Sequence, residues 1–127
     1  MKELTKAEEQ VMHYLWQLKK AYLKDIVKAY PTPSPAYTTV STVVNVLVKK
    51  GFIGFETHGK AREYYAQISQ SQYRKYAFKS MLNSFFNDSP AQFASFFTKE
   101  NDLDMQELEE LKKMIEDKIA NQQKDQQ

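Results

Sequence analysis

The chain has 127 residues, of which 42% are hydrophobic and 27% charged, as expected for one folded domain or for a small domain with an appendage. It contains no cysteine, which excludes disulfides, thiolate metal sites and thiol nucleophiles. Charge is uneven: residues 1–69 carry ten basic and six acidic side chains, a net charge of +4, whereas residues 70–127 carry eight and ten, a net charge of −2.

Three short helices are predicted in the first 50 residues. Thr5 and Glu8 have the spacing of a capping box, and the apolar residues that follow predict a helix over residues 6–18. Residues 21–23 are expected to be extended, and residues 23–30 to form a second helix that stops at a proline-rich segment, residues 31–35. The apolar residues of the first helix are Val11, Met12, Leu15, Trp16 and Leu18.

The third helix is predicted over residues 38–50. Val40, Val43, Val44 and Leu47 share one helical face, and Gly51 supplies a typical helix end. The many β-branched residues leave a strand as the competing interpretation.

A β-hairpin and further helices complete the chain. Residues 52–57 and 62–68 are rich in aromatic and β-branched residues and flank a turn that contains Gly59. Helices are then expected over residues 71–86, from Pro90 through Phe97, and over residues 104–121, with a polar loop at 98–102 and a frayed tail at 122–127. The predicted fold is mainly α with a small β-hairpin: a winged helix-turn-helix over residues 1–69 and a helical region over residues 70–127.

The third helix carries polar groups that can contact nucleic acid. Hydroxyl and amide side chains on its outer face can bond base edges, and basic residues near its end and in the hairpin suit phosphates. The candidate DNA-binding residues are Tyr37, Thr38, Thr39, Ser41, Thr42, Asn45, Lys49, His58, Lys60 and Arg62, and Lys50 is a further candidate for a phosphate.

These segments resemble the penicillinase-repressor family of winged-helix transcriptional regulators. The A-E-x-x-V-M-x-x-L-W pattern ending at Trp16, the T-V-x-T helix starting at Thr39, the K-K-G-F-I step ending at Ile53 and the aromatic strand around Tyr64 all occur in order. The resemblance implies a cytoplasmic homodimeric repressor that binds an inverted-repeat DNA operator and needs no cofactor.

The resemblance also implies a function for residues 70–127. They are expected to form a helical dimerisation region that a membrane-bound sensor metalloprotease cleaves at the pair Ser95 and Phe96. The absence of cysteine excludes copper sensing through thiolates. The candidate dimerisation residues are Tyr76, Leu82, Phe85, Phe86, Phe93, Phe96, Phe97, Leu108, Leu111, Ile115 and Ile119.

Enzymes and membrane proteins are poor alternatives. The two histidines, His13 and His58, lie far apart in the sequence, and no phosphate-binding loop or nucleophile motif occurs, so neither a catalytic site nor a metal site is predicted. No apolar run reaches the roughly 20 residues of a membrane span, and residues 1–15 do not resemble a signal peptide, so no membrane association is expected. A winged-helix protein–protein adaptor that does not bind DNA remains the alternative.

Overall fold

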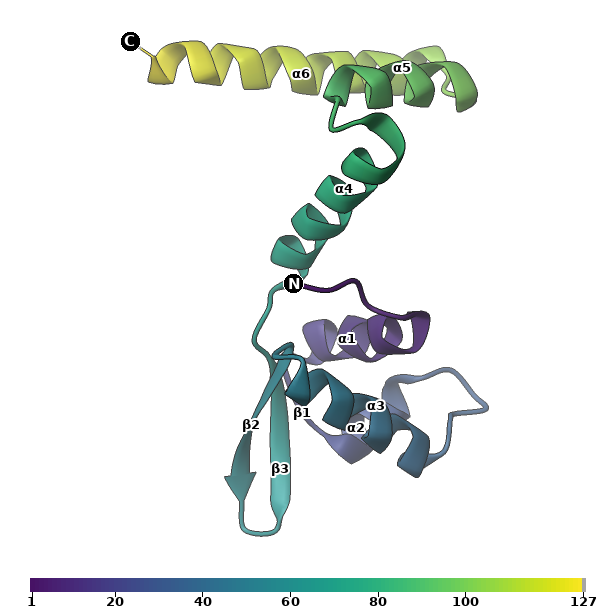
Figure 1. The fold of residues 1–127 in the computed structure, drawn as a ribbon, viewed down its shortest axis with the longest axis vertical. Helices are drawn as coiled ribbons and strands as arrows, with labels where there is room; N and C mark the ends of the chain where they lie inside the picture. The colour runs from purple at the N-terminus through teal and green to yellow at the C-terminus, as the bar shows by residue number, and fades with distance from the viewer. Residues whose placement is uncertain (127) are drawn as a thin grey trace. The chain divides into compact units, whose positions relative to one another are not determined.

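The computed structural model describes residues 1–126 (Figure 1). Its elements, in chain order, are α1 (Lys6–Leu18), β1 (Lys20–Tyr22), α2 (Leu23–Ala29), α3 (Tyr37–Lys49), β2 (Ile53–His58), β3 (Ala61–Ala66), α4 (Gln70–Phe86), α5 (Pro90–Glu100) and α6 (Met105–Asp125). The predicted mainly helical fold with a hairpin wing is confirmed. Contacts divide the chain into two compact units, Met1–Ser80 and Met81–Gln127, with the division inside α4 rather than at the predicted boundary of 69 and 70.

The first unit contains a three-stranded antiparallel sheet in the order β1-β3-β2. The hairpin pairs Ile53 with Ala66 at its base and His58 with Ala61 at its tip, where Gly59 has a φ of 63°. The short extended piece after α1 is the third strand, and it pairs Lys20 with Tyr65. Because β3 is central, a residue of β3 can have cross-strand neighbours on both sides.

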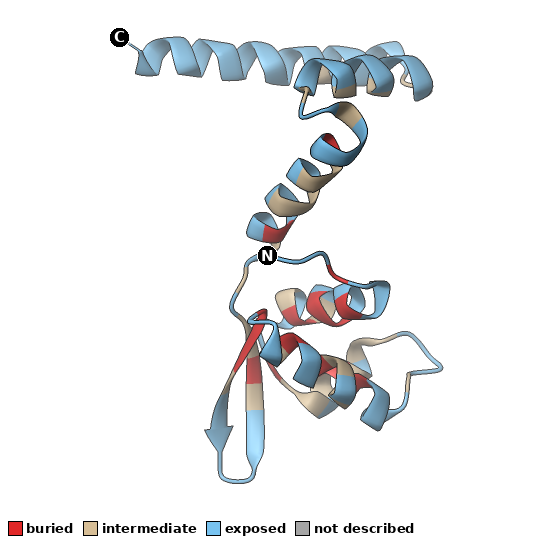
Figure 2. Cartoon of the chain, viewed as in Figure 1, coloured by how far each residue is buried: buried red, intermediate tan, exposed pale blue. Residues whose placement is uncertain are grey.

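The core of the first unit forms where α1, α2 and α3 pack on this sheet. Figure 2 shows its buried residues concentrated in α1, α3 and the base of the hairpin. Two hydrogen bonds join the core to the segment after the wing: the Trp16 indole donates to the Ile68 carbonyl at 2.9 Å, and the buried Leu4 N–H donates to the Tyr73 hydroxyl at 3.0 Å. The first turns of α4 therefore belong to the first unit.

The predicted segment 38–50, for which both a helix and a strand were considered, is helical and corresponds to α3. Val40, Val44 and Leu47 are buried on one face, so tertiary packing overrides the low helix propensity of the β-branched residues. The helix ends in a Schellman motif: Phe52 N–H donates to the Leu47 carbonyl at 3.0 Å and Gly51 N–H to the Val48 carbonyl at 3.1 Å. Gly51 has a φ of 85°, which explains a glycine at this point.

The second unit has very little interior. Phe86 contacts Phe93 and Phe96, with ring centroids 5.6 and 5.5 Å apart, but no described residue of α5 or α6 is buried (Figure 2). Among residues 1–126, no helix combines the length and apolar character that crossing a bilayer requires.

Two local predictions were wrong. The predicted loop at 98–102 is helical as far as Glu100, because the Thr98 hydroxyl donates to the Ala94 carbonyl at 2.8 Å and the Asn101 amide donates to the Phe97 carbonyl at 3.1 Å. The predicted frayed tail is helical through Asp125, and Gln127 lies outside the described residues.

Candidate nucleic-acid interface

The outer surface of α3 consists of two neighbouring rows of residues. Tyr37, Ser41 and Asn45 follow one another at intervals of four and form the first row. The second row runs from Thr38 through Thr42 and Asn45 to Lys49, at intervals of three and four. Asn45 belongs to both rows, and the buried residues of the helix lie on other faces.

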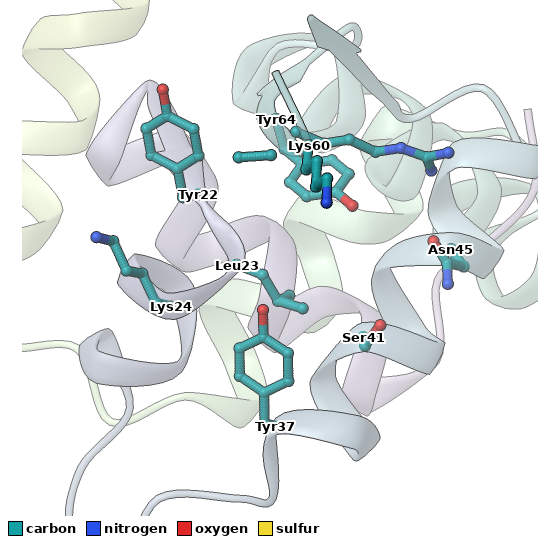
Figure 3. Close-up of a pocket in the computed structure, with 10 residues that line it drawn as sticks. Tyr22, Leu23, Lys24, Tyr37, Ser41, Asn45, Lys60 and Tyr64 are labelled. Carbon is teal, nitrogen blue, oxygen red and sulfur yellow. The ribbon is translucent and has the colours of Figure 1, made fainter. Parts of the chain in front are cut away.

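The first row of α3 lines a concave surface of about 610 Å³ that it shares with the wing and with the start of α2 (Figure 3). The wing contributes Lys60, Arg62 and Tyr64, and the start of α2 contributes Leu23 and Lys24. We call this surface the α3–wing groove. Three of its side chains are cationic and, among the residues described as lining it, none is acidic. The groove therefore combines positive charge with hydroxyl and amide groups.

The structure brings together five of the ten predicted DNA-binding residues in this groove: Tyr37, Ser41, Asn45, Lys60 and Arg62. The second row is exposed beside it, and the Thr42 hydroxyl donates back to the Thr38 carbonyl at 2.9 Å, leaving its oxygen free to accept. Thr39 lies elsewhere, because it lines a different hollow next to the proline-rich segment, with Tyr30 and Val43.

Arg62 and His58 have partners of their own on the wing. The Arg62 guanidinium lies 4.3 Å from the centre of the Phe55 ring, a cation–π contact that restrains the side chain without neutralising its charge. The His58 Nε2 atom lies 3.4 Å from a carboxylate oxygen of Glu63 and 3.8 Å from one of Glu56. Two carboxylates therefore stand beside the histidine that was predicted to face DNA.

Lys50, which the sequence suggested for a phosphate, forms an ion pair with Glu8 of the first unit. Its Nζ atom lies 2.7 Å from the Glu8 carboxylate, and the Thr5 N–H donates to the same carboxylate at 2.9 Å. Burial by itself raises the pKa of Glu8, but the hydrogen bonds from Lys50 and Thr5 and the charge of Lys50 outweigh it, so the pKa lies below its ordinary value of 4.5. Lys50 therefore joins α1 to the end of α3.

Nine of the eleven predicted dimerisation residues lie in the second unit and are exposed or partly exposed. The exposed fraction is 76% for Phe85, 53% for Phe96 and 60% for Ile115. α5 and α6 form an apolar groove of about 680 Å³, lined by Phe93, Phe97, Leu108, Leu111 and Ile115 among others. Leu82 and Tyr76 differ from the rest: Leu82 is buried, and Tyr76 packs against the core of the first unit.

Sequence reasoning missed several residues on these surfaces. Tyr22, at the end of β1, and Lys24, at the start of α2, line the α3–wing groove, although the sequence gives no sign that this segment faces the wing. Val46, 39% exposed on α3, is an apolar group beside the second row, and Met105 and Met114, 71% and 66% exposed, extend the apolar surface of α6. The 3–4 spacing that identified Leu108 and Leu111 could also have found the two methionines.

A helix-turn-helix followed by a two-stranded wing, with a cationic groove between the third helix and that wing, defines a winged-helix DNA-binding protein. The chain belongs to the penicillinase repressor family, which matches residues 4–117. The family consists of transcriptional repressors rather than enzymes, as the sequence motifs implied.

Individual relatives are similar along most of their length. The chain is 26% identical over 117 residues to the methicillin resistance regulatory protein MecI of Staphylococcus aureus strain N315, covering 91% of this chain and 95% of MecI. It is 25% identical over 116 residues to the penicillinase repressor of Bacillus licheniformis, covering 91% of each chain. Among solved structures, the DNA-binding domain of the repressor BlaI matches with a TM-score of 0.49 and 26% identity, covering 57% of this chain and 94% of that domain.

Proposed function

We propose that this protein represses transcription as a cytoplasmic homodimer that binds an inverted-repeat operator, with α3 in the major groove and the wing against the DNA backbone. The α3–wing groove is the observation that carries the proposal, because it joins three cations to a row of hydroxyl and amide groups without an acid in its described lining. Phosphates favour the cations, and base edges can bond the polar groups.

Different residues of the interface have different roles in this proposal. Asn45 reads a base, since its amide can bond adenine at two atoms and it stands where both exposed rows of α3 meet. Ser41 and Thr42 assist with hydroxyl contacts. Lys24, Lys60 and Arg62 bind phosphates, which sets the position of the protein but carries no sequence information.

Fluorescence anisotropy with duplexes from the protein's own promoter tests these roles. Asn45→Ala should cost about 1–3 kcal/mol for the operator and relax the sequence preference at one position of each half-site. Lys60→Gln should weaken binding to all duplexes by a similar factor and reduce the salt dependence by about one phosphate contact. Lys6→Gln is the matched control, because Lys6 lies in another hollow, beside Trp16 and Tyr73.

Two results would oppose this function. If neither operator nor unrelated duplex binds with an affinity that falls steeply with salt, the fold serves as a protein–protein adaptor instead. If Asn45→Ala changes affinity equally for every sequence, Asn45 is not a base-reading residue. A footprint with two half-sites about one helical turn apart would support the symmetric complex.

The homodimer is supported by the absence of buried residues in α5 and α6 of the second unit. Helices that bury no residue of their own cannot offset the conformational entropy lost on folding, so their exposed apolar side chains need a partner surface. A second copy of the chain provides an identical apolar groove and so a self-complementary interface.

Sedimentation at equilibrium tests the homodimer. Leu111→Glu places a charge in the apolar groove and should yield monomers, whose operator affinity falls because the two half-sites no longer act together. Lys113→Glu introduces the same residue at an exposed position of α6 outside the groove, and should leave the dimer intact. A dimer that persists in Leu111→Glu would place the interface elsewhere.

Release from DNA by proteolysis is the last part of the proposal. Ser95 and Phe96 are exposed, and they lie within α5, which has no buried residue to resist local unfolding into an extended form that a metalloprotease can bind. Cleavage there would separate α6 from the DNA-binding unit. Mass spectrometry of the protein from induced cells should show a fragment that ends at Ser95, and its absence in cells that have lost repression would oppose this route.

A further inference from the structure

Three side chains that can bind a metal converge on one face of the wing. Glu56, His58 and Glu63 each place one ligand atom within 4.8 Å of the ligand atoms of the other two. His58 and Glu56 are exposed and Glu63 is partly buried, so the group faces solvent at the surface of the sheet. We call these three residues the wing cluster.

The strand register produces this convergence. Glu56 of β2 lies directly opposite Glu63 of β3, and His58 follows Glu56 by two residues, so the side chains project from the same face. On its other side, Glu63 pairs with Tyr22 of β1, and the Tyr22 ring contacts the His58 ring edge-on, with centroids 6.4 Å apart. The imidazole is therefore held on the carboxylate side of the sheet.

The charges of the wing cluster are not balanced by the rest of the wing. Two carboxylates directly opposite each other in a sheet repel, and among the described residues the basic side chain recorded beside each of them is His58. The nearest arginine in sequence, Arg62, projects toward Phe55 instead. A cation between the two carboxylates would relieve this repulsion.

The distances suit a metal ion better than direct hydrogen bonds. The separations of 3.4 and 3.8 Å between the His58 Nε2 atom and the two carboxylates exceed the usual donor–acceptor range of about 2.7–3.2 Å. Two ligands of a tetrahedral zinc ion lie roughly 3.3–3.6 Å apart, given metal–ligand bonds of about 2.0–2.2 Å. All three ligand atoms lie within 4.8 Å of one another, so the two glutamate side chains would have to approach each other by about 1 Å to share one ion.

We propose that Glu56, His58 and Glu63 form a binding site for one divalent transition-metal ion of the zinc type. One imidazole nitrogen favours a transition metal over Mg²⁺ or Ca²⁺, which prefer oxygen ligands throughout. Two carboxylates match the charge of a dication, and solvent completes the coordination because the cluster is exposed. This site does not depend on the DNA-binding function proposed above.

Calorimetric titration of the full-length chain with Zn²⁺ tests the site, with Co²⁺ absorption as a second probe of coordination. One ion per chain should bind, and both His58→Ala and Glu63→Gln should lose at least tenfold in Zn²⁺ affinity. His58 is exposed and Glu63 is partly buried, so circular dichroism of each variant checks that it is folded. His13→Ala removes the other histidine, which is exposed on α1, and should bind Zn²⁺ as the wild type does.

Three results would overturn the assignment. The wild type could fail to bind one equivalent of Zn²⁺, or His58→Ala could bind it with unchanged affinity. Loss of binding in His13→Ala would also assign the ion to a different place. None of these measurements requires DNA.

Discussion

Lys50 should act on the stability of the first unit and not on DNA affinity, although it stands next to residues proposed to contact DNA. Its Nζ atom lies 2.7 Å and 3.0 Å from the two oxygens of Glu8, whose side chain is 6% exposed, whereas the Lys50 side chain is 31% exposed. Lys50→Gln would leave the buried Glu8 carboxylate with Thr5, whose backbone N–H donates to it at 2.9 Å, as its remaining described partner.

The expected cost follows from this geometry. Removing one partner of a buried ion pair costs about 3–5 kcal/mol, and the partial exposure of Lys50 reduces this to about 2 kcal/mol. Guanidinium unfolding followed by fluorescence of the single tryptophan, Trp16, reports on this unit, at one protein concentration because dimerisation shifts the midpoint. Each single substitution leaves one charged side chain without its partner. In Glu8→Gln combined with Lys50→Gln neither charge remains, so the double variant should lose less free energy of unfolding than the sum of the two single variants.

Acid gives an independent measurement of the same contact. The folded-state pKa of Glu8 lies below its ordinary value of 4.5, so the unfolded chain binds a proton more readily and the contribution of Glu8 is present above that value. It should decline as pH falls below 4.5 through the folded pKa, and this decline should be missing in Glu8→Gln. Unchanged stability in Lys50→Gln, together with a lower salt dependence of DNA binding, would refute this account and make Lys50 a phosphate contact.

Three further predictions follow from other features. Gly51→Ala should destabilise the first unit by about 1–2 kcal/mol in guanidinium unfolding, since a φ of 85° is unfavourable for any residue with a Cβ, and an unchanged midpoint would contradict the proposed helix end. Tyr73→Phe should cost about 1–3 kcal/mol by the same assay, because the buried Leu4 N–H loses its acceptor, and a neutral result would mean that water replaces the hydroxyl. Chelation of Zn²⁺ with EDTA should weaken operator binding roughly threefold to tenfold, because the ion offsets about 1 kcal/mol of repulsion between the wing carboxylates and phosphates, and His58→Ala should not respond.

Local chemistry made much of the first unit predictable. The capping box at Thr5, the Schellman glycine at Gly51 and the glycine turn of the hairpin each involve residues only a few positions apart. Their effect is therefore present in the sequence itself. The apolar spacing of α3 was sufficient to predict the winged helix, and the order of the family motifs was sufficient to predict the family.

The polar residues at the end of α5 led to a wrong loop prediction, because their side chains can bond the backbone in more than one conformation. Thr98 was expected in a loop because such residues favour turns, but in the structure its hydroxyl bonds the Ala94 carbonyl of its own helix. Asn101 lies just after that helix and caps it, because its amide donates to the Phe97 carbonyl. A hydroxyl or amide can satisfy either conformation.

Contacts between residues far apart in the sequence could be determined only from the tertiary structure. Lys50 meets Glu8 across 42 positions, the Tyr73 hydroxyl meets Leu4 across 69, and the strand register brings Glu63 to Glu56 and His58. The rotation of α3 on its core likewise sends Ser41 into the groove and Thr39 to another hollow. Sequence periodicity specifies which residues share a face, but only packing of the apolar core determines which polar groups those faces bring within reach of each other.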